Sequence, residues 1–230
     1  MTLSPSETKP LDAAEFTTNW RQAVEQGFEP AYSFPHLPVR YRSKTLLNFS
    51  GYDAEIAKAK AALDLGGSVF ISGICGSGKT HLAVGLFRYR LAAMLVFHDD
   101  PIRVSFDAFQ RARFFPVSEF FVDLKSAMDD HTPEDEILNR YSWPDLIVLD
   151  DIGAEKVSDW SRQMFYTLID RRYRDLKQTI ITSNLSLPDL SAKIDDRVGS
   201  RITEMCHRIF LKGDKRIDIA NAREEKAIPQ

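Results

Sequence analysis

Short apolar runs alternate with amphipathic stretches over most of the chain. Three of the apolar runs are rich in β-branched residues, which is typical of buried strands. Two weaker runs predict further strands, and Pro116 restricts one of these to the edge of a sheet or to a short piece. The five strands are expected at residues 68–73, 113–118, 145–151, 179–184 and 208–212.

Between the strands, apolar residues recur at the spacing of an α-helix. In one such stretch, Trp160, Phe165, Leu168 and Ile169 fall on one side. Strands that alternate with helices predict an α/β domain with a mainly parallel sheet. The helices are expected at residues 52–64, 79–95, 121–130, 159–176 and 195–206.

The start of the chain has a different pattern, because five of the eleven prolines precede residue 40. Asp12 and Glu15 have the spacing of a capping box, and Phe16 and Trp20 then begin an apolar stripe at helical spacing. We therefore expect three parts: an N-terminal arm at 1–47 with a short amphipathic helix at about 13–26, a core at 48–213 and a polar tail at 214–230.

Composition excludes several classes of protein. The 230 residues are 43% hydrophobic and 27% charged, which is typical of a globular chain and not of a disordered or collagen-like one. A net charge of −3 provides no general attraction for nucleic acid. Two cysteines do not form a disulfide framework, and no apolar run reaches the roughly 18 residues of a membrane span. We expect a cytoplasmic protein that does not bind membranes.

The first candidate for chemistry follows the strand at 68–73. GICGSGKT, residues 73–80, fits the phosphate-loop pattern G-x-x-x-x-G-K-[ST] between a strand and a helix. Its glycines let backbone N–H groups point at phosphate oxygens, and the helix N-terminus adds partial positive charge. Lys79 is expected to contact the β- and γ-phosphates of ATP, and the Thr80 hydroxyl to bind Mg²⁺. The residues expected at the nucleotide are Gly73, Ile74, Cys75, Gly76, Ser77, Gly78, Lys79, Thr80 and His81.

Two members of this set have alternative roles. Cys75 is expected to be a small residue at a variable position, although a thiol at a helix N-terminus can also be reactive. His81 is favoured as a packing or supporting residue. The five histidines of the chain have no metal-ligand spacing, so we expect no structural metal site.

Polar side chains follow two other predicted strands. LIVLDDIG places Asp150 and Asp151 at the carboxyl end of a buried strand, where open α/β sheets bind ligands. We expect Asp150 to hold Mg²⁺ and Asp151 to polarise an attacking water. TIITSN ends at Asn184, which is either a hydrogen-bond donor to the γ-phosphate or water, or a plain turn residue.

Together these segments resemble the AAA+ ATPases, and more specifically the DnaC/IstB-type helicase loaders. GSGKTHLA, LIVLDDIG, TIITSN and DDRVGSRI are similar to the phosphate loop, acidic strand, first sensor and arginine-finger helix of that group. HLPVRYRSKTLLNF, residues 36–49, resembles its segment ahead of the ATPase core, and the resemblance extends to about residue 212. It implies an ATPase that loads a DnaB-like replicative helicase onto single-stranded DNA and grips the helicase through its N-terminal extension.

The resemblance also implies residue roles. Asp151 takes the catalytic role that glutamate usually fills, and Asn184 is the sensor. Arg201 is the finger that reaches the nucleotide of a neighbouring copy, which implies self-association, and Arg197 is the second candidate. The alternative is a helix surface on which both arginines are salt-bridged beside Asp195 and Asp196. The catalytic residues that the resemblance implies are Asp151, Asn184 and Arg201.

Other parts of the chain depart from the family pattern. The arm has no cysteine cluster for a zinc domain, and we expect no lid domain after residue 213. The stretch at 98–113 is either a surface excursion or an insertion that contacts DNA or a partner. Tyr41 and Phe49 have two possible places, near the adenine or in the core.

Single-stranded DNA sites combine basic and aromatic side chains. Basic clusters are Arg40/Arg42/Lys44, Arg88/Arg90, Arg111/Arg113 and Arg171/Arg172/Arg174. Aromatic residues that interleave with them are Phe87, Tyr89, Phe109, Phe114 and Phe115. Each cluster alone is more typical of a solvated helix face, so DNA binding is expected mainly from the resemblance.

Three other functions compete with the helicase loader. An IstB-like helper ATPase of a transposase would have the same core. A small-molecule P-loop kinase would need an acceptor pocket and an arginine-bearing lid. A non-hydrolysing adaptor would use ATP only to order its fold, and measured turnover distinguishes it from an ATPase.

Overall fold

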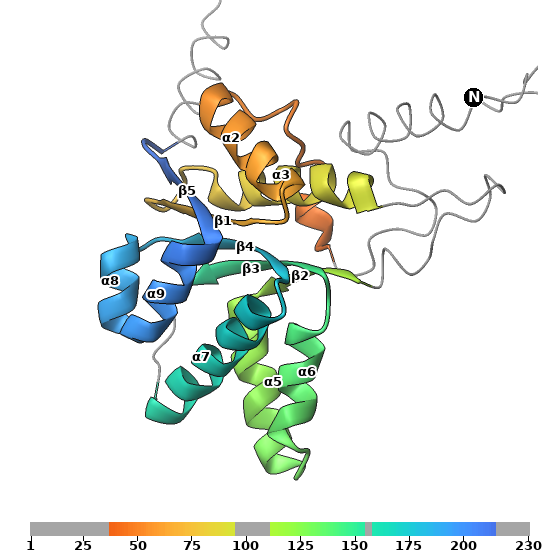
Figure 1. Ribbon diagram of the computed structural model, residues 1–230, viewed down its shortest axis with the longest axis vertical. Helices are drawn as coiled ribbons and strands as arrows, with labels where there is room; N and C mark the ends of the chain where they lie inside the picture. The colour runs from red at the N-terminus through yellow and green to blue at the C-terminus, as the bar shows by residue number, and fades with distance from the viewer. Residues whose placement is uncertain (1–36, 95–110, 155–157, 215–230) are drawn as a thin grey trace, which may run out of the picture.

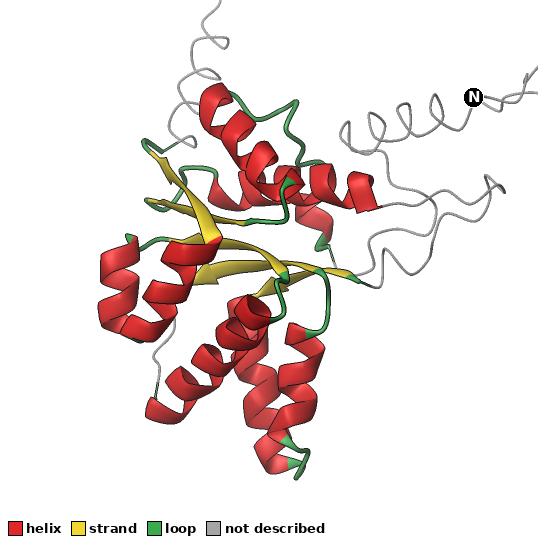
Figure 2. Ribbon diagram, in the orientation of Figure 1, coloured by secondary structure: helices red, strands yellow, loops and turns green. Residues whose placement is uncertain are grey.

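A five-stranded parallel sheet lies between two layers of helices (Figures 1 and 2). The computed structural model describes residues 37–94, 111–154 and 158–214. Every strand pair is parallel, in the order β2-β3-β4-β1-β5, which confirms the predicted α/β class. The strands are β1 (Ser68–Gly73), β2 (Ala112–Pro116), β3 (Leu146–Ile152), β4 (Gln178–Ser183) and β5 (Cys206–Leu211).

The helices divide between the two faces of the sheet, as Figure 1 shows. One face is covered by α2 (Asp53–Asp64) and α3 (Lys79–Met94), with the short 3-10 helix η1 (Val39–Tyr41) ahead of them. The other face is covered by α5 (Val117–Asp129), α6 (Glu134–Ser142), α7 (Asp159–Arg174), α8 (Leu187–Lys193) and α9 (Asp196–Met205). None of the described helices is long and apolar enough to cross a membrane.

The strands send alternate side chains to the two faces. Val69 and Ile71 of β1 pack in the cluster that includes α2 and α3, whereas Phe70 packs with the helices of the opposite layer. Val148 and Ile147 of β3 divide in the same way. A parallel sheet covered on both faces needs apolar residues throughout its strands, which explains the continuous apolar runs of the sequence.

Strand β2 lies at the edge of the sheet, as Pro116 predicts. Pro116 is the last residue of β2 and also the N-cap of α5, with φ −59° and ψ 131°. The helix therefore begins at Val117, earlier than the expected 121, and buries Val117, Phe120 and Leu124. One proline thus ends the strand and starts the helix.

Two helices, α6 and α8, were not expected from the apolar pattern. The first turn of α6 carries Glu134, Asp135 and Glu136, which interact favourably with the positive end of the helix dipole. Ser186 caps α8 by accepting a hydrogen bond from the Asp189 backbone N–H. Both signals are at the helix N-terminus and not in the apolar pattern, because these helices are short.

Several sequence predictions lie outside the described residues. These are the helix at about 13–26 with Phe16 and Trp20, most of the 98–113 stretch and all but the first residue of the tail at 214–230. Leu37 and Phe49, which are described, are buried in the same cluster as α3. The division of the chain into arm, core and tail remains a prediction.

Candidate functional site

The phosphate loop connects β1 to α3 and is tightly packed at its first residue. A Cβ atom on Gly73 would lie 2.4 Å from the Leu211 carbonyl oxygen of β5, so only glycine fits there. Gly78 has φ +95°, a conformation that favours glycine. The residue types required for phosphate binding are therefore also the residue types that this backbone path requires.

Lys79 is the residue through which the loop contacts a neighbouring strand. Its Nζ donates to the carbonyl oxygens of Gly73 (2.9 Å) and Ile74 (2.8 Å) and to Asn184 Oδ1 (2.6 Å). An ammonium group has three N–H donors, and these three acceptors hold it at the mouth of the loop. Lys79 is only 7% exposed, so its charge acts in a partly dehydrated environment.

Asp150 lies on β3, and its carboxylate faces the start of α3. Thr80 Oγ1 donates to Asp150 Oδ1 at 2.9 Å, and Thr182 Oγ1 of β4 donates to the same oxygen at 2.7 Å. Burial raises the pKa of Asp150, while the two threonine hydrogen bonds act in the opposite direction. The structure thus brings Thr80 and Asp150, the expected Mg²⁺ ligands, into direct contact.

Asp151 and Asn184 complete the same cluster. Asn184 Nδ2 donates to Asp151 Oδ1 at 2.6 Å, so Asn184 joins Asp151 to Lys79. Asp151 has φ +63° and lies within a register shift between β3 and β4. This irregularity places two consecutive aspartates at the site, one buried and one exposed.

Thr182 is a member of the cluster that the sequence analysis did not single out. Its hydroxyl donates to Asp150 and accepts from the Asp151 backbone N–H at 2.8 Å. The alternation of strand residues could have identified it, because Thr182 falls on the same face of β4 as Ile180, and Asp150 on the same face of β3 as Val148. Both of these faces point toward α3.

The donor set fits Mg²⁺. This ion prefers oxygen ligands and keeps several waters, so it is usually held by one or two protein groups together with substrate phosphates. A hydroxyl and a carboxylate in contact match that requirement. Among the described residues there is no group of three or more His, Cys, Asp or Glu side chains that could form a metal cage.

The remaining loop residues differ in exposure. Ile74 is 54% exposed and Cys75 is an exposed free thiol. The Ser77 hydroxyl is buried and has no hydrogen-bond partner within the described part of the chain. A buried hydroxyl of this kind, inside the loop, fits a site that is completed by a bound polar group.

His81 points away from the loop. Its Nε2 lies 2.7 Å from Asn48 Oδ1 and 3.0 Å from the Thr45 carbonyl oxygen, and its ring contacts Phe49 edge-on at 5.2 Å. These contacts favour the supporting role. Phe49 is buried in the core, and Tyr41 packs on Phe114 at 5.6 Å.

Arg201 lies on α9 and contacts α7 of the same chain. Its Nε donates to Asp170 Oδ1 at 3.2 Å, and its guanidinium lies 4.4 Å from the centre of the Tyr173 ring. The Arg201 side chain is 32% exposed and that of Asp170 is 17% exposed. Arg201 is therefore held at the surface by one ion pair and one stacking contact.

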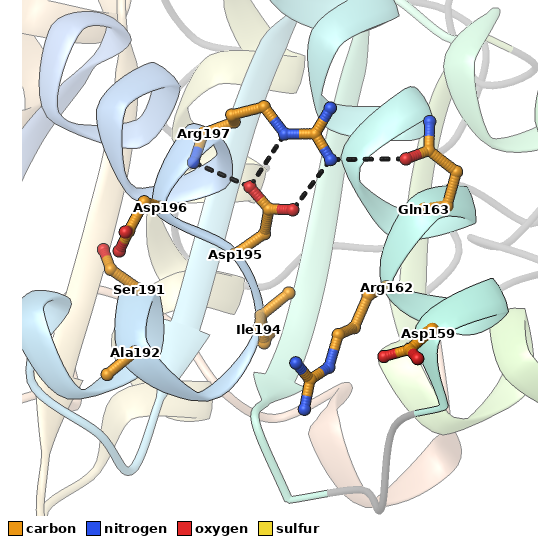
Figure 3. A pocket seen from close by; sticks show the side chains of 9 residues that line it. All are labelled: Asp159, Arg162, Gln163, Ser191, Ala192, Ile194, Asp195, Asp196 and Arg197. Atoms are coloured by element: carbon orange, nitrogen blue, oxygen red, sulfur yellow. Dashed lines mark hydrogen bonds and ion pairs between the residues drawn. The ribbon is translucent and has the colours of Figure 1, made fainter.

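Arg197, one turn earlier, is held in a similar way at the edge of a pocket of about 490 Å³ (Figure 3). It forms an ion pair with Asp195, donates to Gln163 and lies 4.0 Å from the centre of the Tyr166 ring. Figure 3 shows that the pocket lies between α7 and the α8–α9 turn, with Arg162 opposite Arg197. Both arginines considered for the finger are thus held by α7 residues that the sequence analysis did not predict.

Some members of the predicted basic clusters are interior residues. Arg88 and Arg172 are fully buried, and Arg172 donates to the carbonyl oxygens of Ser142 and Pro144. Burial lowers the pKa of Arg172 to about 9. Phe87, Phe114 and Phe115 are buried in the core as well. These side chains support the fold and form no stacking surface for nucleic acid.

Comparison with known proteins identifies a family of ATP-binding proteins. The family model described as "IstB-like ATP binding protein" matches residues 63–218. The phage-like element PBSX protein XkdC of Bacillus subtilis (strain 168) is 29% identical over 153 residues, which are 64% of this chain and 51% of XkdC. The chain therefore spans about half the length of that relative.

Two further comparisons cover more of the chain. The insertion sequence IS21 putative ATP-binding protein of Pseudomonas aeruginosa is 26% identical over 209 residues, 85% of this chain and 71% of that protein. A crystal structure of the DnaC helicase loader is similar with a TM-score of 0.59 at 26% identity, over 76% of this chain and all of that one.

Proposed function

Because the chain belongs to the IstB-like ATP-binding protein family, we propose that it is a Mg²⁺-dependent ATPase that works as a molecular switch. The observation that carries the proposal is the cluster that joins three parallel strands: Lys79 to Asn184 and Asp151, and Thr80 to Asp150. This cluster lies where the phosphates bound by the loop would end.

Binding would replace contacts that are present within the chain. Lys79 would exchange Asn184 and the loop carbonyls for phosphate oxygens, and the buried ammonium makes this charge-assisted contact strong. Thr80 and Asp150 would hold Mg²⁺, which, when bound, neutralises charge on the phosphate oxygens. Hydrolysis would then depend on positioning and charge stabilisation, with no covalent intermediate on the protein.

Asp151 is the residue that we assign to the attacking water. Its exposed carboxylate is oriented by the 2.6 Å hydrogen bond from Asn184, so the two residues would hold the water in line with the terminal phosphate. An aspartate reaches less far than a glutamate. We therefore propose a slow ATPase.

Arg201 is the residue that we assign to assembly. Its guanidinium is partly exposed on the α9 surface and its contacts there are of the weak, exchangeable kind. In a neighbouring copy's site it would stabilise the charge that develops on the transferred phosphate. Hydrolysis would then require two copies of the chain, and Arg197 is the second candidate.

We propose a helicase-loading role for this switch, with a replicative helicase and single-stranded DNA as partners. The similarity to the DnaC helicase loader supports it. The IS21 relative, which matches 85% of this chain, favours a second candidate, the helper ATPase of a transposase. The N-terminal arm is the part that we expect to bind either partner.

Two measurements on the full chain test these proposals. Binding of a fluorescent ATP analogue with and without Mg²⁺ tests the site, and phosphate release over a range of protein concentrations tests assembly-dependent hydrolysis. Nucleotide binding without turnover at any concentration, with or without single-stranded DNA, would show a non-hydrolysing adaptor.

The choice of partner requires a separate experiment. The full chain is mixed with purified replicative helicase in one arm and with purified IS21-type transposase in the other, in each case with and without Mg·ATP. Association with the helicase supports the loader, and association with the transposase alone supports the helper ATPase. Deletion of residues 1–30 is expected to abolish the association and to leave nucleotide binding intact.

A further inference from the structure

One face of helix α3 contacts the segment 42–49, and we call this row of contacts the seam. Three of its residues, His81, Gly85 and Arg88, follow one another at a spacing of four and three and therefore share one face. Each contacts the segment 42–49: His81 bonds to Thr45 and Asn48, Gly85 faces Leu46, and Arg88 donates to the Arg42 carbonyl oxygen. The seam begins directly beside Thr80, which faces the nucleotide site.

The geometry determines which nitrogen of His81 carries the hydrogen. Asn48 Nδ2 donates to the Ser43 carbonyl oxygen at 2.6 Å, so the opposite atom of this amide is the acceptor Oδ1. A carbonyl oxygen such as that of Thr45 is also only an acceptor. Since Nε2 lies within 3.0 Å of both, it must be the donor, shared between the two oxygens. His81 thus holds the turn at Thr45–Asn48 against α3 by one shared N–H donor.

That turn is closed by two hydrogen bonds between its end residues. The Thr45 backbone N–H donates to Asn48 Oδ1 at 2.9 Å, and the Asn48 backbone N–H donates to Thr45 Oγ1 at 3.3 Å. The two residues therefore hold each other's backbone in place, and His81 joins this unit at the same Asn48 oxygen. A movement of the His81 ring is transmitted to the whole turn and not to one side chain.

Gly85 explains how closely the segment lies. A Cβ atom at this position would come within 2.8 Å of Leu46 Cδ2 and 3.0 Å of the Leu46 backbone nitrogen. Glycine destabilises a helix interior relative to alanine, so its presence here is explained by the close approach of Leu46. The helix backbone at Gly85 therefore lies against both the side chain and the backbone nitrogen of Leu46.

We propose that His81 is a positioning residue that couples the nucleotide site to the segment 42–49, through which the N-terminal arm joins the core. Thr80 and His81 are adjacent in the first turn of α3, one facing Asp150 and the other facing Asn48. Ordering of this turn by bound phosphate and Mg²⁺ therefore stabilises the seam as well. The inference rests on nucleotide binding at the proposed site but does not require hydrolysis.

Hydrogen exchange of the full chain tests this coupling. Peptides that cover residues 42–49 are followed with and without Mg²⁺ and a non-hydrolysable ATP analogue, at concentrations that saturate each variant. In the wild-type chain the analogue should slow exchange in this segment by roughly tenfold, the equivalent of about one net hydrogen bond. His81→Leu should lose most of this change, because leucine has no donor. His81→Gln should retain it, because its amide donates at a similar reach.

Two more variants separate coupling from general loosening of the helix. Gly85→Ala removes no hydrogen-bond donor but pushes Leu46 away, and it should also lose the analogue-dependent protection. Tyr89→Phe is the matched control: it removes a hydrogen bond of the same helix, but the Tyr89 hydroxyl donates to Asp64 on α2, so the protection should be unchanged.

The outcomes are distinguishable. Analogue-dependent protection that is full in both His81→Leu and Gly85→Ala overturns the coupling, and so does a wild-type chain that binds the analogue without any protection of 42–49. A wild-type chain that does not bind the analogue overturns the proposed function together with the coupling that rests on it. Loss of protection in Tyr89→Phe as well would assign the effect to the helix as a whole and not to His81.

Discussion

The phosphate-loop site and the α7–α9 face hold their charged side chains in different ways. At the loop, Lys79 and Asp150 are each 7% exposed and are bonded to groups on neighbouring strands. On the α7–α9 face, Arg197 and Arg201 lie at the surface against tyrosine rings and single carboxylates.

This difference indicates what each region is built to do. Buried charges that bond to one another are held close together before the ligand arrives, so binding exchanges their partners without having to assemble the site. Exposed ion pairs are worth only about 0–1 kcal/mol, so a second copy of the chain can compete for the same arginine. The groups of the phosphate-loop site are preorganised, whereas the arginines of the α7–α9 face are available for contact with a second copy of the chain.

The largest expected effect is a loss of hydrolysis on changing Arg201 of the α7–α9 face. Arg201→Ala should bind Mg·ATP nearly as well as the wild type but hydrolyse it about 10³–10⁵-fold more slowly, which is the usual contribution of an arginine finger. Steady-state phosphate release at high protein concentration measures it. An equal mixture with Lys79→Ala should recover part of the activity, because intact sites of one variant then meet intact fingers of the other. A mixture without recovery, together with activity per molecule that is independent of dilution, would place Arg201 outside the reaction.

The next largest effect is a loss of hydrolysis on changing Asp151 at the phosphate-loop site. Asp151→Asn should retain Mg·ATP binding, because Asp150 and Thr80 remain, while hydrolysis falls by about 10²–10⁴-fold as the water loses its base. Binding by titration and turnover by phosphate release are compared in the same preparation. Equal losses in both would show that Asp151 is part of the metal site and not of the water site.

A third prediction concerns affinity. Lys79→Ala should weaken ATP binding by at least about thirtyfold, because it removes one partner of a dehydrated charge contact. The fold should survive, because the ammonium bonds to the loop and to Asn184 and not to the apolar core. Isothermal titration gives the affinity, and circular dichroism gives the fold. A folded variant with unchanged affinity would show that the loop is not part of the nucleotide site.

The two regions also differ in how much the sequence predicts. The loop is contiguous at 73–80, and its partners Asp150 and Asn184 come directly at strand ends, so a parallel sheet brings them together. In the sheet, β4 lies between β1 and β3, so Asn184 comes at the end of the strand between the loop and the two aspartates. Local pattern and sheet topology suffice here.

Contacts across the helical layers were not predictable in this way. The partners of Arg201 lie on another helix, Asp170 being 31 residues earlier, and His81 bonds to Asn48, 33 residues earlier. Helical spacing shows which residues share a face but not which face meets another helix or segment. For the same reason Arg172 was counted as part of a surface cluster, although it is fully buried.

The smallest expected effect tests how firmly the α7–α9 face holds its arginine. Asp170→Asn removes the charge that pairs with Arg201 and leaves the Tyr173 ring in place. Since this pair is only partly buried and Arg201 keeps its contact with the Tyr173 ring, we expect the loss to be about 1 kcal/mol, so hydrolysis should change by less than about fivefold in either direction. The control is Asp135→Asn, which removes an ion pair between α6 and α7 through Arg171 and should leave hydrolysis unchanged. If Asp170→Asn instead lost as much activity as Arg201→Ala, the contact with α7 would be required for the reaction, and Arg201 would act within its own chain and not on a neighbour.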